Sequence, residues 1–439
     1  MSAAPPAYWQ PDGECMDREE LEQLQLERLQ ATLVRTWRNV PFYRRRFDEI
    51  GFDPEGLRTL ADIQRLPFTT KADLIQSYPY GMYAVPLRDV VRLHASGGTG
   101  SAAIVMAYSR NDIKTWSNLM ARMLVAGGVT KDDVVQITFN YGLLAGAFGV
   151  HYGAERLGAS VIPTSSGNTK RQLKIMQDYK TTVLVSTPGY ALHLAEVARD
   201  AGLGPGSFSL RVGMLGGEPW SEEVRREIEE RLHLIAIDNY GLSELLGPGI
   251  AGECTEKNGL HVNEDHFLVE VIDPVTLKPV PPGQVGELVM TSLTKEAFPL
   301  VRYRTRDLSA ILPGACPCGR TLVRVRRLLG RSDDMIIIRG VTVHPSAVDT
   351  VLRDILGSVP DYQIFVERPG TLDEATLHIH VSGSLFFDEM KLQTGFIDKV
   401  RRRLSSELGV TFEVKLVGPR PGDGSPGGIT SKVVDLRRK

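Results

Sequence analysis

Apolar residues near the N-terminus recur at the spacing of a helix. Between Asp17 and Ile50, leucines stand at intervals of three to five residues among Glu, Gln and Arg, which predicts an amphipathic helix. Pro41 interrupts this pattern, because proline lacks the N–H group that a helix interior needs.

From about Leu93 the pattern changes to short, continuous apolar runs that alternate with stretches of helical period. Strands that alternate with helices need crossover connections, so the pattern predicts an α/β fold with a largely parallel sheet. The expected buried strands are 134–139, 181–186, 210–215 and 234–237, and the expected helices between them include 190–201 and 221–231.

The pattern of apolar and turn residues changes again at Phe267. Short β-rich runs at 267–272 and 286–291 are broken by Pro-Pro-Gly and Asp-Pro turns, which predicts a smaller antiparallel β subdomain. After Gly330 a compact α+β unit follows, with expected strands 335–338, 362–366, 375–381 and 411–417 and helices 345–356 and 388–408. We therefore expect an N-terminal domain over 1–330, its β subdomain at about 250–325, a hinge at 331–334 and a C-terminal domain over 335–439.

Composition narrows the class of protein. Lys and Arg total 51 against 53 for Asp and Glu, so the basic excess typical of a nucleic-acid-binding protein is missing. No apolar run reaches the ~18 residues that a membrane span requires, and no signal-peptide pattern precedes Cys15. A chain of 439 residues with four cysteines does not depend on disulfides, which favours a cytoplasmic location.

The first candidate site is a loop of glycines and hydroxyl residues, Ser96-Gly97-Gly98-Thr99-Gly100-Ser101, between two extended segments. Glycine turns expose backbone N–H groups that can wrap a polyphosphate. The loop matches neither the Walker pattern nor a dinucleotide fingerprint. Taken alone, such a loop is more often an ordinary turn than a phosphate site.

Two more polar loops follow expected strands of the same sheet. Gly216-Gly217-Glu218-Pro219 follows the run 210–215, and Asn239-Tyr240-Gly241-Leu242-Ser243-Glu244 follows the run 234–237. Ligands of open parallel sheets gather at the carboxyl ends of the strands. Tyr240 offers a flat face for a purine, and Ser243 and Glu244 offer oxygen ligands for Mg²⁺. Together the three loops favour a nucleotide site.

Two downstream segments complete the set, namely Tyr303-Arg304-Thr305-Arg306-Asp307 and Gly330-Arg331-Ser332-Asp333-Asp334. The segments, in this order and spacing, resemble the core motifs of the acyl-adenylate-forming superfamily, and most closely those of the phenylacetate–coenzyme A ligase family. His151-Tyr152-Gly153-Ala154-Glu155 and Glu264-Asp265-His266-Phe267 also match. The similarity extends from about Phe42 to the C-terminus.

The resemblance implies a role for each matching residue. Ser96, Gly97, Gly98 and Thr99 would hold the β- and γ-phosphates of ATP, and Glu244 would reach Mg²⁺. Glu218, Pro219 and Tyr240 would form the adenine slot, Asp307 would bind the ribose, Arg331 would contact ribose or phosphate, and Asp333 would be the hinge. Gly217, Asn239, Gly241 and Ser243 would complete the nucleotide loops, and the acid would lie against Tyr141, Gly142, Ala145 and Gly149.

The implied reaction has two halves. A carboxylate of an aromatic acid attacks the α-phosphorus of ATP, which releases pyrophosphate and forms an acyl adenylate. The C-terminal domain then rotates, and the thiol of coenzyme A attacks the activated carbonyl and releases AMP. Positioning and charge neutralisation supply most of the catalysis of such a displacement between anions.

The sequence departs from the family pattern at two lysines. The family loop continues Thr-Gly-Lys, whereas Gly100-Ser101-Ala102 stands here. The family's C-terminal catalytic lysine follows a glycine, and that register holds Gly428-Ile429. Lys432, three residues later, is the nearest cation and is our candidate for the catalytic lysine; the alternative is a surface lysine.

Three cysteines and a histidine form a candidate metal site. Cys254 and His261 are followed by Cys316-Pro317-Cys318-Gly319, and a Cys₃His set suits tetrahedral zinc in a closed structural site. His266 is an alternative nitrogen ligand, and free buried thiols are the alternative to a metal site.

The sequence leaves three functions open. The first is an ATP-dependent aryl-acid–coenzyme A ligase, and the second is an adenylate former that passes the acyl group to a carrier protein or another nucleophile. The third is a non-catalytic nucleotide-binding or zinc-bearing interaction protein, which the two lysine departures would permit. Members of the family commonly dimerise, so a homodimer is a further possibility.

Overall fold

The computed structural model describes residues 8–96, 103–332, 336–343, 345–356, 360, 362–380, 390–417 and 432–437. The chain divides into two compact units, with the boundary between Ser332 and Asp333. Asp333, the expected hinge residue, lies outside the described residues. Among the helices that are described, none combines the length and apolar character that a membrane crossing requires.

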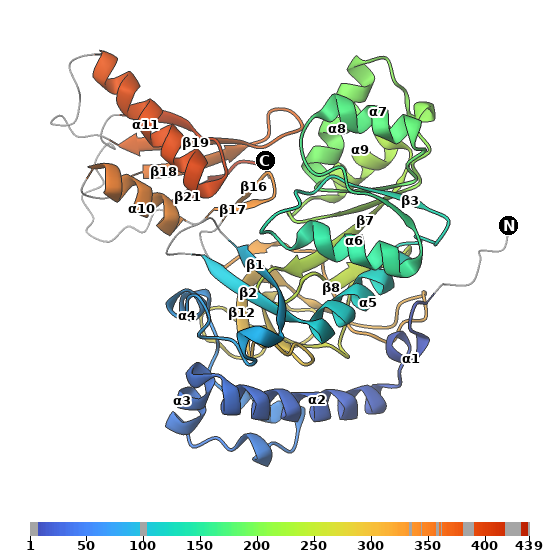
Figure 1. Cartoon of the computed structure of the whole chain (residues 1–439), viewed down its shortest axis with the longest axis vertical. Helices are drawn as coiled ribbons and strands as arrows, with labels where there is room; N and C mark the ends of the chain where they lie inside the picture. The colour runs from blue at the N-terminus through green and yellow to red at the C-terminus, as the bar shows by residue number, and fades with distance from the viewer. Residues whose placement is uncertain are drawn as a thin grey trace. The chain divides into compact units, whose positions relative to one another are not determined.

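The larger unit begins with helices that run beneath the main body (Figure 1). The short α1 (Pro11–Glu14) precedes the long α2 (Arg18–Asn39), and α3 (Pro41–Glu49) starts at Pro41, which occupies the first helical position as expected. Buried hydrogen bonds tie α2 to the segments around β10, since Gln25 Nε2 donates to the Glu264 carbonyl and Thr32 Oγ1 to that of Leu293.

A mixed sheet forms the centre of this unit, in the order β13-β14-β9-β8-β7-β6-β5-β3-β4. Its parallel part contains the four predicted strands and a fifth, short strand at 160–162 that the sequence pattern did not predict, and the α/β prediction is confirmed. The parallel strands are β3 (Val134–Ile137), β4 (Ser160–Ile162), β5 (Val183–Ser186), β6 (Val212–Gly216) and β7 (Ile235–Leu242). The antiparallel part, which the sequence pattern did not predict, consists of β8 (Gly247–Glu253), β9 (Leu260–Val262), β13 (Ile311–Leu312) and β14 (Arg324–Val325).

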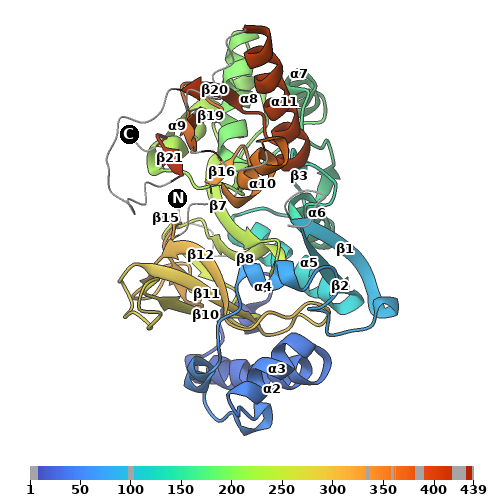
Figure 2. The ribbon, with the colours of Figure 1, turned by 90° about the vertical axis from the view of Figure 1, so that its left-hand side faces the viewer.

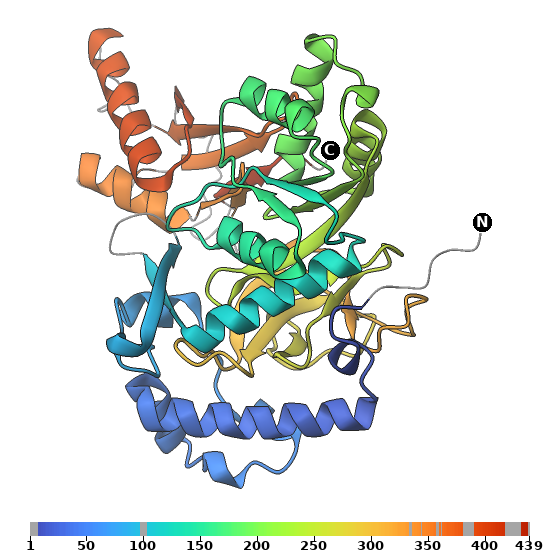
Figure 3. The same cartoon turned by 45° about the vertical axis from the view of Figure 1, so that its right-hand side comes forward.

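Helices cover both faces of this sheet because side chains of successive strand residues point to opposite faces. Val183 and Val185 belong to the core shared with α5 (Arg110–Ala126) and α6 (Gly146–Leu157), whereas Leu184 packs in the core of the other helices. Those are α7 (Thr169–Asp178), α8 (Pro188–Asp200) and α9 (Glu222–Leu232), drawn in green in Figure 1; Figure 3 shows the teal α5 and α6 as a separate group.

A second sheet, in the order β10-β11-β12-β15, corresponds to the predicted β subdomain and is visible in gold in Figure 2. It is antiparallel throughout. Its strands are β10 (Phe267–Ile272), β11 (Gly286–Ser292), β12 (Tyr303–Ser309) and β15 (Gly330–Arg331). The hairpin of β1 (Val90–Ser96) with β2 (Ile104–Ser109), and the short α4 (Lys71–Gln76), complete the larger unit.

The smaller unit has its own core, in which Leu352, Ile364 and Leu404 are fully buried. Its main sheet has the order β20-β19-β18-β21, with helices α10 and α11. The bounds are β16 (Ile336–Ile338), β17 (Val341–Val343), α10 (Pro345–Leu356), β18 (Tyr362–Glu367), β19 (Glu374–His380), α11 (Met390–Leu408), β20 (Glu413–Val417) and β21 (Val433–Asp435). The elements expected in this region all have counterparts here.

A buried ion pair joins α5 to the turn before β10. Both side chains are nearly inaccessible to solvent, and Arg122 Nη1 and Nη2 donate to Asp265 Oδ1 and Oδ2 at 2.8 and 2.9 Å. Burial alone would raise the pKa of Asp265, but attraction and hydrogen bonds from His266 and Arg122 outweigh it and hold the pKa well below its usual range.

Replacing Asp265 by Asn should therefore destabilise the protein in a pH-dependent way. Near neutral pH the loss should be about 3–5 kcal/mol, because the variant leaves the buried Arg122 without its counter-charge. A depressed carboxyl pKa contributes stability above the unfolded value of about 3.9, and this contribution disappears as the pH falls through the lower, folded value. The difference between variant and parent should accordingly shrink in acid.

Urea unfolding midpoints measured at about pH 7, and again from about pH 4 down to about pH 2, test this expectation, because the contribution is lost only below the unfolded pKa. Asp178→Asn is the matched control, because Asp178 forms an exposed pair with Lys174 on α7 and its loss should change stability by less than about 1 kcal/mol. Equal midpoints for Asp265→Asn and the parent near neutral pH would contradict the assignment.

Candidate functional site

The described residues expected to bind the nucleotide fall into three groups in the larger unit. One surrounds Glu244, one joins Tyr240 to Asp307, and one occupies the turn between β6 and α9. Gly97, Gly98 and Thr99 of the first loop lie outside the described residues, so only Ser96, the last residue of β1, represents that loop here.

Glu244 lies in the turn between β7 and β8, and its side chain is nearly buried. Ser96 Oγ donates to Glu244 Oε1 at 3.4 Å, and Lys71 Nζ approaches the same oxygen at 3.7 Å. A buried carboxylate beside a hydroxyl oxygen is a suitable ligand set for Mg²⁺. Ser243, its neighbour, is half-buried in the same turn.

Lys71 is a site residue that the sequence did not reveal. It is the first residue of α4, and the Thr70 side chain caps that helix in a capping box with Asp73. The local signal was present, because Thr-Thr-Lys-Ala-Asp is typical of a helix start. The residues next to Lys71 in the sequence, however, do not indicate that it faces the carboxylate of Glu244, more than 170 positions downstream.

Tyr240 and Asp307 connect the two sheets of the larger unit. The buried phenol of Tyr240 on β7 donates to Asp307 Oδ2 on β12 at 2.7 Å, while Arg331 of β15 makes a close ion pair with Asp307 Oδ1. Burial, followed by the neighbouring charge of Asp307, raises the pKa of Tyr240, so its hydroxyl stays protonated and donates. Tyr240, expected at the adenine, and Arg331, expected at the ribose or phosphate, thus both contact Asp307, which is expected to bind the ribose.

The segment 239–244 differs from the expectation of a loop after a strand. Strand β7 continues through Leu242 and pairs with β8, with Tyr240 opposite Ala251 and Gly241 opposite Pro248. A Cβ atom on Gly241 would lie 2.2 Å from the Gly247 carbonyl oxygen, so only glycine allows these backbones to approach. The glycine that suggested a loop is instead required by a close strand pairing.

The turn after β6 carries the third group. Gly217 has φ +82°, a conformation that favours glycine. Glu218 is buried, and its Oε1 accepts the N–H of Gly189 at the start of α8 at 2.6 Å, while Asn239 Nδ2 donates to the Leu215 carbonyl at 2.6 Å. Pro219 follows in the same turn and is half-buried.

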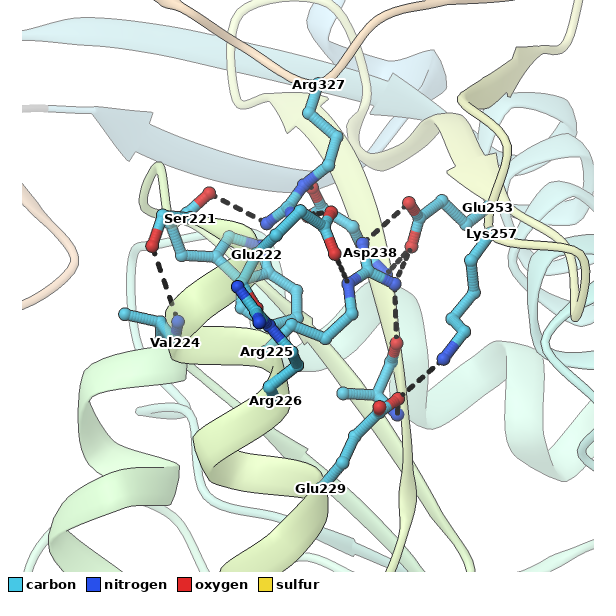
Figure 4. A network of polar contacts seen from close by, with 12 residues as sticks. Ser221, Glu222, Val224, Arg225, Arg226, Glu229, Asp238, Glu253, Lys257 and Arg327 are labelled. Atoms are coloured by element: carbon cyan, nitrogen blue, oxygen red, sulfur yellow. Dashed lines mark hydrogen bonds and ion pairs between the residues drawn. The ribbon is translucent and has the colours of Figure 1, made fainter.

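A network of charged residues supports this turn from behind (Figure 4). Arg327 donates to the Trp220 carbonyl at 2.8 Å and pairs with Asp238 of β7 at 3.0 Å, while Arg225 of α9 makes two bonds of 2.7 and 2.8 Å to Glu253 of β8. Burial, opposed by Arg327, raises the pKa of Asp238 to about 6. These pairs fix the end of the turn against the sheet.

The segment expected to contact the acid contains an aromatic group. The ring centroids of Tyr141 and Phe148 are 5.2 Å apart, those of Phe148 and Tyr152 are 6.3 Å apart, and Tyr141 Oη is 3.1 Å from His151 Nδ1. Gly142 has open space, since a Cβ there would meet only the Asn140 side chain at 3.9 Å.

The other two residues expected to contact the acid differ from Gly142. Ala145 is fully buried. A Cβ on Gly149 would lie 2.5 Å from the Trp116 ring, so Gly149 packs closely against Trp116. No motif in the sequence pointed to Trp116, yet its ring forms one boundary of this aromatic region.

The cysteines and histidine named as metal ligands come together at the β9 and β14 end of the large sheet. The ligand atoms of Cys254, His261, Cys316 and Cys318 all lie within 4.8 Å of one another, and all four residues are buried. Cys254 Sγ is 3.7 Å from Cys316 Sγ, and Cys318 Sγ is 3.5 Å from His261 Nε2. His266 is elsewhere, with Nδ1 2.7 Å from Thr294 Oγ1.

The Cys254–Cys316 and Cys318–His261 separations are close to the edges of a tetrahedral zinc centre. Bonds of about 2.3 Å to sulfur and about 2.0–2.1 Å to nitrogen give tetrahedral edges of about 3.8 Å and about 3.5 Å. Hydrogen bonds from Cys254 and His261, against the effect of burial, lower the pKa of Cys318 and favour the thiolate that a metal needs.

Lys432, in the smaller unit, lies just before β21. Its Nζ is 2.7 Å from Asp349 Oδ1 of α10 and 4.8 Å from the centroid of the Tyr362 ring, and the side chain is 39% exposed. Ile429, which occupies the family's lysine register, is outside the described residues.

Comparison with known proteins places these features in context. Residues 89–294 match the family model of the AMP-binding enzymes, and residues 340–437 match that of the AMP-binding enzyme C-terminal domain. Phenylacetate-coenzyme A ligase of Thermus thermophilus is 45% identical over 98% of this chain and 100% of its own length. The enzyme of the same name from Escherichia coli is 43% identical over 95% of each chain.

Among solved structures, 2-hydroxyisobutyryl-CoA ligase in complex with 2-HIB-AMP and CoA, in the thioesterification state, superposes with a TM-score of 0.92. It is 31% identical, and the match covers 100% of this chain and 94% of that one.

Proposed function

The chain belongs to the phenylacetate–coenzyme A ligase family, and from this premise we propose that its acid substrate is an aromatic carboxylate of the phenylacetate or benzoate type. The protein is an AMP-forming acid–thiol ligase. It activates a carboxylic acid with ATP as an acyl adenylate and then forms a thioester with coenzyme A. These relatives support coenzyme A rather than a carrier protein as acceptor, and they support a catalytic rather than a purely binding role.

The observation that carries the aromatic assignment is the group formed by Tyr141, Phe148 and Tyr152. Adjacent rings offer the edge and face contacts that an aryl group prefers over an aliphatic one. The phenylacetate ligases that resemble this chain support the same choice, since they are more similar to it in sequence than the ligase for the aliphatic 2-hydroxyisobutyrate. Gly142 leaves room beside Tyr141 for the ring of the acid.

The nucleotide roles follow from the three groups of residues at the strand ends. We assign Glu244 and Ser96 to the triphosphate end, with Glu244 as a ligand of Mg²⁺; when bound, this ion supplies positive charge to the departing pyrophosphate. Asp307 accepts hydrogen bonds from Tyr240 and Arg331 and would accept those of the ribose hydroxyls. The turn at Gly217, Glu218 and Pro219 would border the adenine.

In the adenylation half-reaction the acid carboxylate attacks the α-phosphorus and pyrophosphate leaves. The chain's contribution is to hold two anions in line and to balance their charge. Lys71, 3.7 Å from Glu244, brings a cation to this end of the site, and the sequence 100–102 contains none. The ammonium of Lys432 would supply the other positive charge after it leaves Asp349.

We also propose one structural zinc ion per chain, held by Cys254, His261, Cys316 and Cys318. His261 Nδ1 is buried without a hydrogen-bond partner among the described atoms, which leaves only the Nε2 side of the ring engaged. The centre would fix the segment between β13 and β14, including Cys316 and Cys318, to the edge of the large sheet.

The substrate assignment is tested with a panel of acids. Pyrophosphate release measured with phenylacetate, benzoate, hydroxybenzoates and aminobenzoates should give a kcat/KM at least about tenfold above that for 2-hydroxyisobutyrate. Formation of the matching aryl thioester should require coenzyme A. A preference for the aliphatic acid would overturn the aromatic assignment and leave the ligase activity intact.

Lys432→Ala tests the catalytic lysine by separating the two half-reactions. Acid-dependent pyrophosphate release should fall by about 100-fold or more, as it does when one preorganised donor is lost. Conversion of supplied acyl adenylate to thioester should persist. Lys415→Ala, at an exposed lysine of the same unit, should leave both rates unchanged. Adenylation by Lys432→Ala at the parental rate would dismiss the assignment.

Metal analysis of protein purified without added metal tests the zinc site. About one zinc per chain is expected, because a closed Cys₃His set binds this ion tightly. Cys316→Ser should lose the zinc and unfold at a lower temperature, whereas Cys15→Ser, at the cysteine outside the cluster, should retain it. Metal-free parental protein would refute the site.

A further inference from the structure

Lys295 is a buried cation that neither the nucleotide assignment nor the packing of the fold uses. It lies in the loop between β11 and β12 and is only 4% exposed. Its Nζ has no hydrogen-bond partner among the described atoms, and it stands 3.8 Å from the centroid of the Tyr108 ring.

The loop is anchored so that Lys295 is held in this position. Asp112 of α5 accepts the backbone N–H of Glu296 at 2.7 Å and that of Ala297 at 3.0 Å. The Glu296 side chain in turn accepts from Ser109 Oγ at 2.8 Å. Asp112 also accepts the N–H of Ser109, so its oxygens are already engaged by three backbone donors.

Stability does not explain a lysine here. A buried ammonium without hydrogen bonds is unfavourable, and its contacts with the Tyr108 ring and, at 5.9 Å, the Phe298 ring offset only part of that penalty. Burial lowers the pKa of Lys295 to about 7, against the attraction of Asp112 and Glu244. An apolar side chain of the same length would fit the site at lower cost. Such unfavourable groups are typical of functional sites.

The charges around Lys295 point to the Glu244 end of the nucleotide site. Asp112 and Glu244 are the anions that face it, and Lys71 is the other cation near Glu244. Burial lowers the pKa of His94 to about 4, so that nearby ring is neutral at physiological pH. Without Lys295 these groups would carry one net negative charge at the point where a polyphosphate must bind. The sequence 100–102 supplies no cation to correct it.

We propose that Lys295 is a positioning residue for adenylation, a buried ammonium that offsets Asp112 and Glu244 and that the incoming phosphate charge keeps protonated, so that the magnesium–ATP triphosphate can bind beside Glu244. Its charge would act through the electrostatic potential around Glu244, and Lys295 itself would contact no reacting atom. This inference rests on the proposed placement of the triphosphate end.

Lys295→Met is the decisive variant, because it keeps the length of the side chain and removes the charge. The affinity for ATP with magnesium, measured by calorimetry, should fall at least about tenfold, as expected for loss of one nearby charge in a partly buried site. AMP lacks the β- and γ-phosphates, so its affinity should change less than about twofold. The melting temperature should stay equal to that of the parent or rise.

Lys114→Met is the matched control. It also removes one positive charge, but from an exposed position on α5 outside the Glu244 group, and it should change none of these readouts. Weaker magnesium–ATP binding with unchanged AMP binding supports the proposal. A lower melting temperature with both nucleotides equally affected, or no change at all, overturns it.

Lys295→Gln, which keeps a polar end, covers the case in which the methionine variant does not fold. If neither variant folds, the charge is structural and the proposal fails. A parent that binds magnesium–ATP weakly would instead count against the nucleotide placement itself.

Discussion

The hydrogen bond from Tyr240 to Asp307 is the contact on which the arrangement of the site depends. Tyr240 belongs to the large mixed sheet and Asp307 to the antiparallel sheet, so this one buried bond holds the two sheets together where the ligand assignments converge. Arg331 extends the contact to β15, which is the last strand of the larger unit. A carboxylate held from two sides keeps its position when a ligand binds, and such preorganisation is what a positioning catalyst needs.

Charged residues elsewhere in the larger unit serve a different purpose. Arg122 with Asp265 and Arg225 with Glu253 are buried pairs with two hydrogen bonds each. A complete pair of this kind specifies which segments meet, although it adds little net stability over apolar packing. Lys295 differs because its ammonium is buried without a hydrogen bond among the described atoms. The contrast separates charges that specify the fold from a charge that the fold tolerates for its function.

The proposed catalytic lysine and the described residues proposed to bind the nucleotide belong to different units of the chain. The described residues assigned to the triphosphate and the ribose, namely Ser96, Glu244, Asp307 and Arg331, belong to the larger unit, whereas Lys432 is held by Asp349 inside the smaller one. The side chains of Lys432 and Asp349 are 39% and 24% exposed, so their ion pair is weak enough for the lysine to exchange Asp349 for another partner. If Lys432 serves adenylation alone, as proposed, it needs a partner that it can leave, such as Asp349, during thioester formation.

The sequence by itself determined the local elements and the family. The spacing of apolar residues and the positions of proline and glycine placed α3 at Pro41, β10 at 267–272 and α10 at 345–356. These signals act over a few neighbouring residues, so they can be recognised without the fold. Spaced motifs were sufficient to identify an adenylate-forming ligase. The cysteine and histidine spacing was also sufficient to name four side chains that the fold brings within 4.8 Å.

Only the tertiary structure decided which distant groups face one another. It extended β7 through Gly241, whose glycine suggests a loop until the close approach of Gly247 is seen. It placed Lys71 beside Glu244 and buried Lys295 over Tyr108, contacts between residues far apart in the chain. Burial and charge are properties of the surroundings that folding assembles, so the pattern around a lysine in the sequence cannot reveal whether it ends in water or in a site.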